Sequence, residues 1–186
     1  AVGSAGVIYS SPDAITWTSR ISPNNPNYTD ITYANGRFVA VGTGTNPVAY
    51  SDDGITWSLP ATPFATNRSG IAYGNGLWIA VASNTVSISS DNGLNWTTTT
   101  PVPELVFITG FAFGNGIFCA TGISENIATT ANGTTWSTVP ILGSNIILDI
   151  VFGNQIFVAI DANGRIFTSN DTLTWTQQRS ADGDTW

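Results

Sequence analysis

The chain has 186 residues and a formal net charge of −7, and 42% of its residues are hydrophobic while only 9% are charged. This composition excludes a disordered chain and is typical of a globular, turn-rich protein. Five Arg against twelve carboxylates, with no Lys and no His, form a surface that repels phosphate groups. We therefore expect no nucleic-acid partner and no anionic membrane surface.

Tryptophan recurs at a nearly constant interval along the chain. The intervals are 40, 39, 40 and 39 residues, between Trp17, Trp57, Trp96, Trp136 and Trp175. A period this regular indicates a repeat architecture, in which each copy of one unit buries its apolar face against the next copy. We predict one domain, residues 1–186, with full repeats at 18–57, 58–96, 97–136 and 137–175 and partial copies at 1–17 and 176–186.

Each full repeat begins with two apolar runs joined by a tight turn. In chain order the turns are Asn35-Gly36, Asn75-Gly76, Asn115-Gly116 and Asn154-Gln155. Asn-Gly between apolar runs is a strong hairpin signal, because a type I′ turn requires positive φ at both central residues. A break of small residues, a third short run and a turn leading to the Trp complete the repeat, without helical periodicity.

We name the four strands of each repeat A to D. Four antiparallel strands in about 40 residues form the blade of a β-propeller, so we predict an all-β propeller fold. Strand A carries a large aromatic residue beside a small or β-branched one, as in Tyr33 with Thr32 and Phe113 with Ala112. A large side chain on one sheet should then fill the space over a small one on the next sheet.

The two ends of the chain bear on the number of blades. Ala1-Val2-Gly3 aligns with Ala40-Val41-Gly42, inside strand B, so the first repeat has no strand A of its own. We predict five blades, with a first blade shared between the two ends. The alternative is a longer parent chain with more blades, and the absence of Met indicates a processed or partial product.

The turn between strands C and D carries the most specific motif. In Ser89–Trp96, Asp91 can accept hydrogen bonds from its own turn, Gly93 can take a positive φ, and Trp96 can enter a contact between blades. Aligned on the tryptophans, the second copy keeps Asp52 and Gly54 but has Tyr50 in the Ser place, and the fourth keeps Gly133. In the Asp and Gly places the first copy has Pro12 and Ala14, and the fifth has Asn170 and Thr172.

The pattern Ser-x-Asp-x-Gly-x-x-Trp resembles the Asp-box, or bacterial neuraminidase repeat. The resemblance implies a propeller of the kind found in sialidases, in photosystem assembly factors and in many secreted or phage-encoded proteins. It also implies that the box supports its turn and lies away from the binding face. A second box-like segment, residues 179–186, follows Trp175 too closely to be a further blade, and we expect an exposed or edge-docked tail.

The residues offer little for catalysis. A sialidase-like site would need three convergent Arg and a Tyr paired with Glu, whereas the five Arg occupy different places in their repeats and Glu occurs only at Glu104 and Glu125. We expect Cys119 to be a buried structural thiol, since no His can activate it. We therefore predict no catalytic residues, no metal site, no cofactor and, without an apolar run near 18 residues, no membrane insertion.

Loops that differ between repeats suggest where binding occurs. The D–A and B–C loops vary in length and content, and in propellers they share one face. The candidate binding residues on these loops are Arg20, Asn24, Asn25, Tyr28, Asn46, Arg68, Asn84, Glu125 and Asn163.

This polar rim favours a non-enzymatic, extracellular or virion-associated module, in which it binds a glycan or a cell-surface or virion protein as part of a larger chain or assembly. The alternatives are a sialidase-like glycoside hydrolase and an assembly scaffold resembling the photosystem factors.

Overall fold

The computed structural model describes the whole chain except residues 65, 84, 100–104, 142, 144–145 and 179–186. The chain divides into two compact units, Ala1–Ala82 with Ser87–Thr99 and Ser83–Val86 with Thr100–Trp186. Each unit consists of antiparallel sheets, and the regular elements among these described residues are strands apart from one short 3-10 turn, η1 (Ser4–Gly6). The predicted all-β fold is confirmed.

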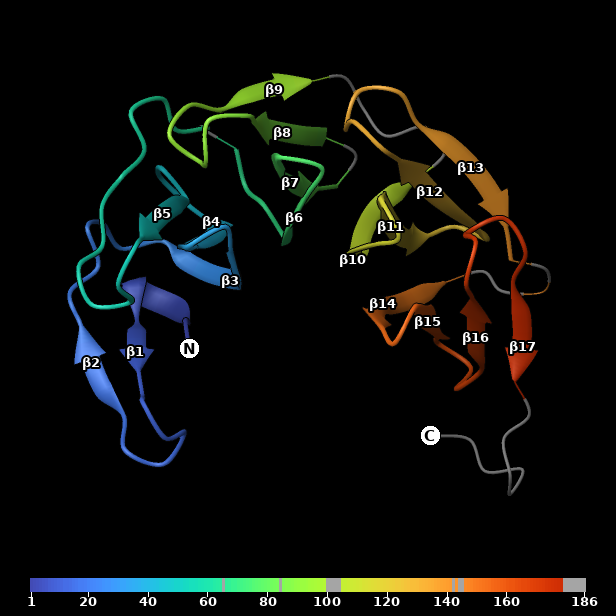
Figure 1. Ribbon diagram of the computed structural model, residues 1–186, viewed down its shortest axis with the longest axis horizontal. Coiled ribbons are helices and arrows are strands. Elements are labelled where there is room, and N and C mark those ends of the chain that lie inside the picture. Colours follow the sequence, from blue (N-terminus) through green and yellow to red (C-terminus); the bar gives the residue numbers. More distant parts are fainter. Residues whose placement is uncertain (65, 84, 100–104, 142, 144–145, 179–186) are drawn as a thin grey trace. The chain divides into compact units, whose positions relative to one another are not determined.

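The first unit holds three sheets, apart from the first two residues of β8, which are assigned to the second unit (Figure 1). The first sheet has two strands, the second has three, and the third has the four predicted strands. Their bounds are β1 (Ile8–Ser10), β2 (Thr18–Arg20); β3 (Asn27–Ala34), β4 (Arg37–Thr43), β5 (Val48–Ser51); and β6 (Gly70–Gly74), β7 (Leu77–Ala82), β8 (Thr85–Ser89), β9 (Thr97–Thr99).

The second unit holds two four-stranded sheets, in which sequence neighbours pair in order (Figure 1). Their bounds are β10 (Val106–Gly114), β11 (Ile117–Ile123), β12 (Asn126–Thr130), β13 (Ser137–Pro140); and β14 (Ile147–Gly153), β15 (Ile156–Asp161), β16 (Ile166–Ser169), β17 (Thr176–Gln178). The predicted blades are therefore present as sheets, whereas closure of a first blade by the two ends of the chain stays a prediction.

The tight turns between strands A and B adopt the predicted conformation. Asn35, Asn75 and Asn115 have φ between 48° and 50°, and the Gly after each has φ between 76° and 80°. In the fourth turn Gln155 takes φ 65° without the freedom of Gly. Positive φ at both central residues matches the right-handed twist of the paired strands.

Within each unit, neighbouring sheets pack through apolar clusters that contain the tryptophan of the later sheet. Trp96 belongs to a cluster with Val39 and Val48 from the preceding sheet, and Trp57 to one with Ile8. Trp175 packs against a cluster that includes Cys119 and Ile127 of the preceding sheet. The predicted contact between blades is therefore confirmed at these three joints.

Size complementarity between sheets is also present. A Cβ atom added to Gly114 would lie 2.1 Å from the ring of Phe152 in the following sheet. Hydroxyl groups of strand A add polar ties, because Thr29 Oγ1 donates to the carbonyl of Arg68 and Thr32 Oγ1 to that of Ile71, each over 2.9 Å. Each tie satisfies a main-chain group at the edge of the next sheet.

In four of the five turns between strands C and D, the predicted register of the motif is wrong by one residue. The side chains that hold the turn lie one residue closer to the tryptophan than the alignment predicts. In the second copy Ser51 and Asp53 hold the turn, not Tyr50 and Asp52, because Asp53 accepts the main-chain N–H groups of Ile55 and Thr56. Asp52 forms an ion pair with Arg37 instead, with 2.6 Å between Nε and Oδ1.

With this register all five turns share one construction. A Ser or Thr hydroxyl donates to an Asp or Asn side chain two residues later, which in turn accepts two main-chain N–H groups. The pairs are Ser11 and Asp13, Ser51 and Asp53, Ser89 and Asp91, Thr130 and Asn132, and Ser169 and Asp171.

The copy at Ser89–Trp96 differs because it contains one additional residue. It has two residues with positive φ, Asn92 at 60° and Gly93 at 83°, where each other copy has one. The fourth and fifth turns take the same conformation with Gly133 and with Thr172, which has φ 64°. The copy that matches the sequence pattern in full is therefore the exception in structure.

We predict that the free energy of unfolding falls as the pH drops from about 4 to about 2. Main-chain N–H groups hold the pKa values of Asp13, Asp53 and Asp91 at about 2, below the ordinary value of 3.8. The unfolded chain therefore binds protons first, so stabilisation that is present above the unfolded pKa is lost as the pH falls through the folded pKa. Urea denaturation at a series of pH values measures this dependence.

Two variants provide the controls for this acid dependence. Asp53→Asn should weaken it, since an amide oxygen already serves the same turn at Asn132. Asn132→Asp should steepen it by adding a carboxylate at the same place. Unchanged pH profiles in both variants would contradict the role assigned to these side chains.

Candidate functional site

The structure brings several predicted binding residues together, but they bind one another. Tyr28 is buried, and its hydroxyl donates to Asn24 Oδ1 over 3.1 Å. The amide of Asn24 donates to the main-chain carbonyls of Thr45 and Asn46 in the neighbouring B–C loop. This network links a D–A loop to a B–C loop, so its polar groups stabilise the loops.

Main-chain bonds show that D–A and B–C loops lie at the same end within each unit. In the first unit Arg68 N–H donates to the carbonyl of Gly42 over 2.7 Å. In the second, Ile141 N–H donates to the carbonyl of Glu125 over 2.7 Å, and Ala162 N–H to that of Ile146 over 3.0 Å. The predicted sharing of one end by these loops is confirmed.

Arg68 is a buried residue and not part of an exposed rim. It is only 1% exposed, and burial lowers its pKa to about 10. Its guanidinium donates to Thr66 Oγ1 and Ser87 Oγ and lies 4.7 Å from the ring centroid of Phe64. Arg68 therefore packs beneath a loop as a structural residue.

The other predicted binding residues are dispersed. Arg20 donates to Ser10 Oγ, Asn25 and Glu125 are exposed, and Asn163 lies in a turn held by Asp161. Asn84 lies outside the described residues. Among the described residues no three or more His, Cys, Asp or Glu side chains gather where they could hold a metal ion.

Cys119 is a structural thiol, as predicted. It is fully buried in the cluster between the two sheets of the second unit, and burial raises its pKa to about 12. A thiol in this state is a poor nucleophile. In the part of the chain that the structure describes, no helix is long and apolar enough to span a bilayer.

We predict that Cys119 resists alkylation by iodoacetamide at pH 8 in the folded chain and reacts fully in denaturant. Because the thiol has no exposed surface, the reaction requires opening of the joint, and its rate should follow unfolding. Intact mass measured over time checks this expectation. Rapid, complete labelling of the folded chain would contradict it.

The linker between the second and third sheets of the first unit covers a motif tryptophan. After Ser58, which bridges to Tyr50, the chain leaves β5, so this sheet lacks a full strand D. Thr62 then pairs in parallel with Asn95 of the next sheet. Phe64 follows and meets the ring of Trp96 edge-on, with 5.2 Å between the ring centroids.

We predict that Phe64→Ala lowers the free energy of unfolding by about 3 kcal/mol, the usual cost of removing a buried aromatic ring. Phe64 is 4% exposed and fills the space over Trp96. Phe107→Ala is the control, because Phe107 is 58% exposed and such a change costs about 0.5 kcal/mol or less. Equal losses measured by chemical denaturation would contradict the proposed packing.

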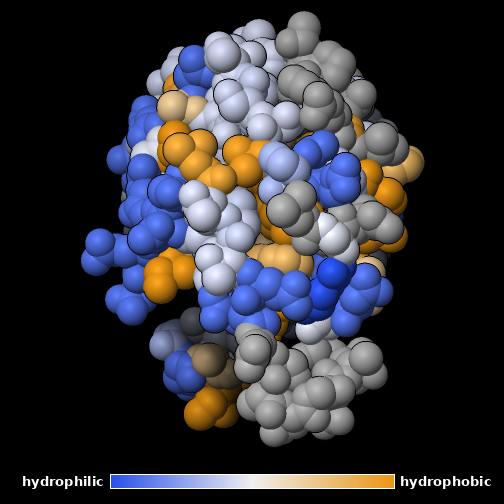
Figure 2. Space-filling view, turned by 90° about the vertical axis from the view of Figure 1, so that its right-hand side faces the viewer, coloured by the Kyte–Doolittle hydropathy of each residue, from blue (hydrophilic) through white to orange (hydrophobic). Residues whose placement is uncertain are grey.

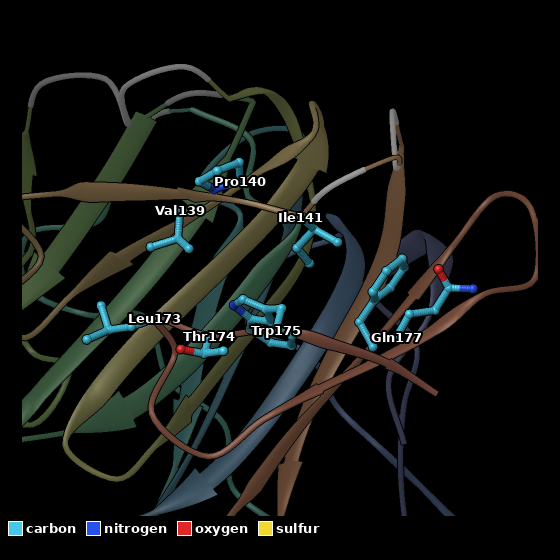
Figure 3. A pocket seen from close by; sticks show the side chains of 8 residues that line it. Val139, Pro140, Ile141, Leu173, Thr174, Trp175 and Gln177 are labelled. Atoms are coloured by element: carbon cyan, nitrogen blue, oxygen red, sulfur yellow. The ribbon is translucent and has the colours of Figure 1, made fainter. Parts of the chain in front are cut away.

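In the second unit the corresponding tryptophan borders an open groove. The groove has a volume of about 480 Å³. In Figure 3, Val139 and Pro140 lie on one side, and Leu173, Thr174 and the ring of Trp175 lie on the other. Ile141, Phe167 and Gln177 complete the lining, so the groove contains no charged side chain.

The groove walls are well defined by hydrogen bonds. Asp171 Oδ1 accepts the N–H groups of Leu173 and Thr174 over 2.9 and 2.8 Å, which holds Leu173 outward with 68% of its surface exposed. The indole of Trp175 donates to the carbonyl of Thr172, which fixes the ring plane. Figure 2 shows hydrophobic patches among hydrophilic residues on the side of the molecule where β13 and β17 lie.

One sequence difference accompanies the open groove. Phe64 lies seven residues after Trp57, and the residue seven after Trp136 is Gly143. Among the described residues of this linker, Gly143 therefore offers no side chain in the place of Phe64. Aligning the linkers on the preceding tryptophan exposes this difference, but the sequence interpretation sought function only in polar loop residues.

These features define a β-propeller with an uncharged groove beside one repeat tryptophan. Residues 11–146 match the model of the DUF6242 beta propeller domain, and the chain belongs to this family. No curated protein matches the sequence.

Solved structures support the fold. The chain is similar to YCF48 bound to D1 peptide, with 18% identity, a TM-score of 0.72, and coverage of 95% of this chain and 62% of that one. YCF48 from Cyanidioschyzon merolae is 16% identical, with a TM-score of 0.70 and coverage of 95% of this chain and 66% of that one. The nidogen/laminin complex is 12% identical, with a TM-score of 0.64 and coverage of 88% of this chain and 71% of that one. The chain spans less than two thirds of either YCF48 chain, and identities this low show the fold alone.

Proposed function

We propose that this propeller is a non-enzymatic scaffold module that holds a segment of a partner protein in the groove beside Trp175. The observation that carries the proposal is the uncharged groove of about 480 Å³, with Leu173 exposed on its rim. An aromatic ring beside a small uncharged groove is a common anchor site for a side chain of a bound protein.

The comparisons give this proposal a precedent. One similar structure is YCF48 bound to D1 peptide, so a propeller of this fold can hold a peptide. A scaffold role of this kind was an alternative in the sequence interpretation, which favoured an extracellular or virion-borne module that binds glycans or surface proteins. Those finer expectations on partner and location stay predictions.

The side chains that could take part in catalysis are engaged in local structure. Arg37 pairs with Asp52 in one sheet and Arg165 with Asp161 in another, while Arg68 is buried beneath a loop. Each of these cations serves local structure, whereas a sialidase-like carboxylate clamp requires arginines that point at the substrate. The Cys119 thiol is likewise withheld by burial.

The proposal is tested by selecting a displayed library of random 12-residue peptides on the immobilised full chain. We expect peptides with apolar anchors, whose binding falls at least tenfold on the Leu173→Asp variant because the rim of the groove becomes charged. Affinities measured by fluorescence anisotropy quantify the loss.

Ile55→Asp is the matched control, since Ile55 is the residue two before Trp57, as Leu173 is two before Trp175. Both side chains are more than half exposed, so neither change should unfold the chain, and thermal unfolding checks this. No selected peptides, or peptides that bind Leu173→Asp as well as the parent chain, would overturn the proposed function.

A further inference from the structure

The joint at Trp96 shows how an extended segment occupies this type of groove. Thr62 N–H donates to the carbonyl of Leu94 over 3.3 Å, and Trp96 N–H donates to the carbonyl of Thr62 over 3.1 Å. Thr62 Oγ1 also donates to Asn95 Oδ1 over 2.7 Å. Thr62 thus forms a parallel bridge with Asn95, and the ring of Phe64, two residues after Thr62, packs edge-on against Trp96.

The groove at Trp175 presents the same main-chain groups without this cover. Leu173 and Thr174 stand in the places of Leu94 and Asn95, counted back from the tryptophan. No described residue donates to the carbonyl of Leu173 or accepts the N–H of Trp175. Within the described part of the chain, neither group therefore forms the bond that its counterpart forms with Thr62 at the other joint.

The linker in the second unit follows a different course. Ile141 corresponds to Thr62, each lying five residues after a tryptophan. Ile141 N–H bonds the carbonyl of Glu125, and Val139 and Pro140 pair with β12, so this stretch completes its own sheet. The described residues 137–141 of the linker therefore pair within their own sheet and not with Thr174.

We propose that the groove at Trp175 binds an extended partner segment that runs parallel to residues 173–175, in the manner of residues 62–64 at Trp96. The partner would carry a residue that exchanges main-chain bonds with Leu173 and Trp175, and an aromatic side chain two residues later that covers Trp175. This inference rests on the proposed function and specifies its binding mode. It is a local form of β-strand addition with one anchor side chain.

The chemistry of the groove narrows the partner further. The hydroxyl of Thr174, in the place of Asn95, favours a polar side chain at the pairing residue. Pro140 has no N–H and ends β13, so the opposite wall offers little for a second strand. The expected motif is a Ser, Thr or Asn followed two residues later by Phe, Tyr or Trp, without charges at these positions.

The chain itself contains a suitable probe, the capped peptide Leu-Pro-Ala-Thr-Pro-Phe-Ala-Thr of residues 59–66. Titrated into the ¹⁵N-labelled full chain, it should shift the amide signals of Leu173, Thr174 and Trp175. The same peptide with Phe64→Ala should bind roughly tenfold more weakly, because it loses the buried ring. Signals around Trp96 should not move, since Phe64 of the chain already covers that ring.

Orientation is tested with a spin label at one end of the peptide. A label at the amino end should broaden the amide signal of Leu173 more than that of Gln177, and a label at the carboxyl end should do the reverse. The opposite pattern, or equal binding of the Phe64→Ala peptide, would overturn the inferred mode.

The two proposals fail separately. If library peptides bind in a manner that depends on Leu173 while the 59–66 peptide does not bind, the mode is wrong and the scaffold function stands. If neither binds, both are wrong. The Leu173→Asp chain should lose the 59–66 peptide as well, and the Ile55→Asp chain should retain it.

Discussion

Every sheet of this protein depends on one side-chain oxygen that satisfies the main chain of the turn between its last two strands. Asp53 shows the arrangement, since a single carboxylate oxygen accepts the N–H groups of Ile55 and Thr56. These groups would otherwise lack partners at a sharp reversal of the chain. At Trp57, Trp96 and Trp175 the closed turn places the tryptophan against the preceding sheet of the same unit, and these three joints are built around that ring.

The joints share this construction and differ in how the tryptophan is covered. Residues after Trp57 leave their sheet at the expense of its fourth strand and bring Phe64 over Trp96. Residues after Trp136 complete their sheet and leave the ring of Trp175 beside a groove. A linker can either pair with the edge of its own sheet or cover the tryptophan of the next sheet. The linker that covers a tryptophan has Phe64 seven residues after the preceding tryptophan, and the linker that completes its own sheet has Gly143 there.

Much of the fold was predictable because it rests on local signals. The interval between tryptophans and the Asn-Gly turns are read directly from neighbouring residues, and positive φ at Asn35 and Gly36 follows from turn chemistry. The register of the Asp motif was wrong in four turns because the longest copy, Ser89–Trp96, served as the reference. Its additional residue is accommodated by a second positive φ at Asn92, which sequence alone does not show.

The sequence by itself determined the repeat, the strand order within each blade and the place of the buried Cys119, since these follow from periodicity and hydrophobic pattern. Only the tertiary structure decided which polar residues are free to bind. Arg68 and Tyr28 are exposed candidates in the sequence and buried, hydrogen-bonded residues in the fold. The groove at Trp175 was likewise invisible, because it results from the path of a linker between two sheets, and that path depends on contacts between residues far apart in the chain.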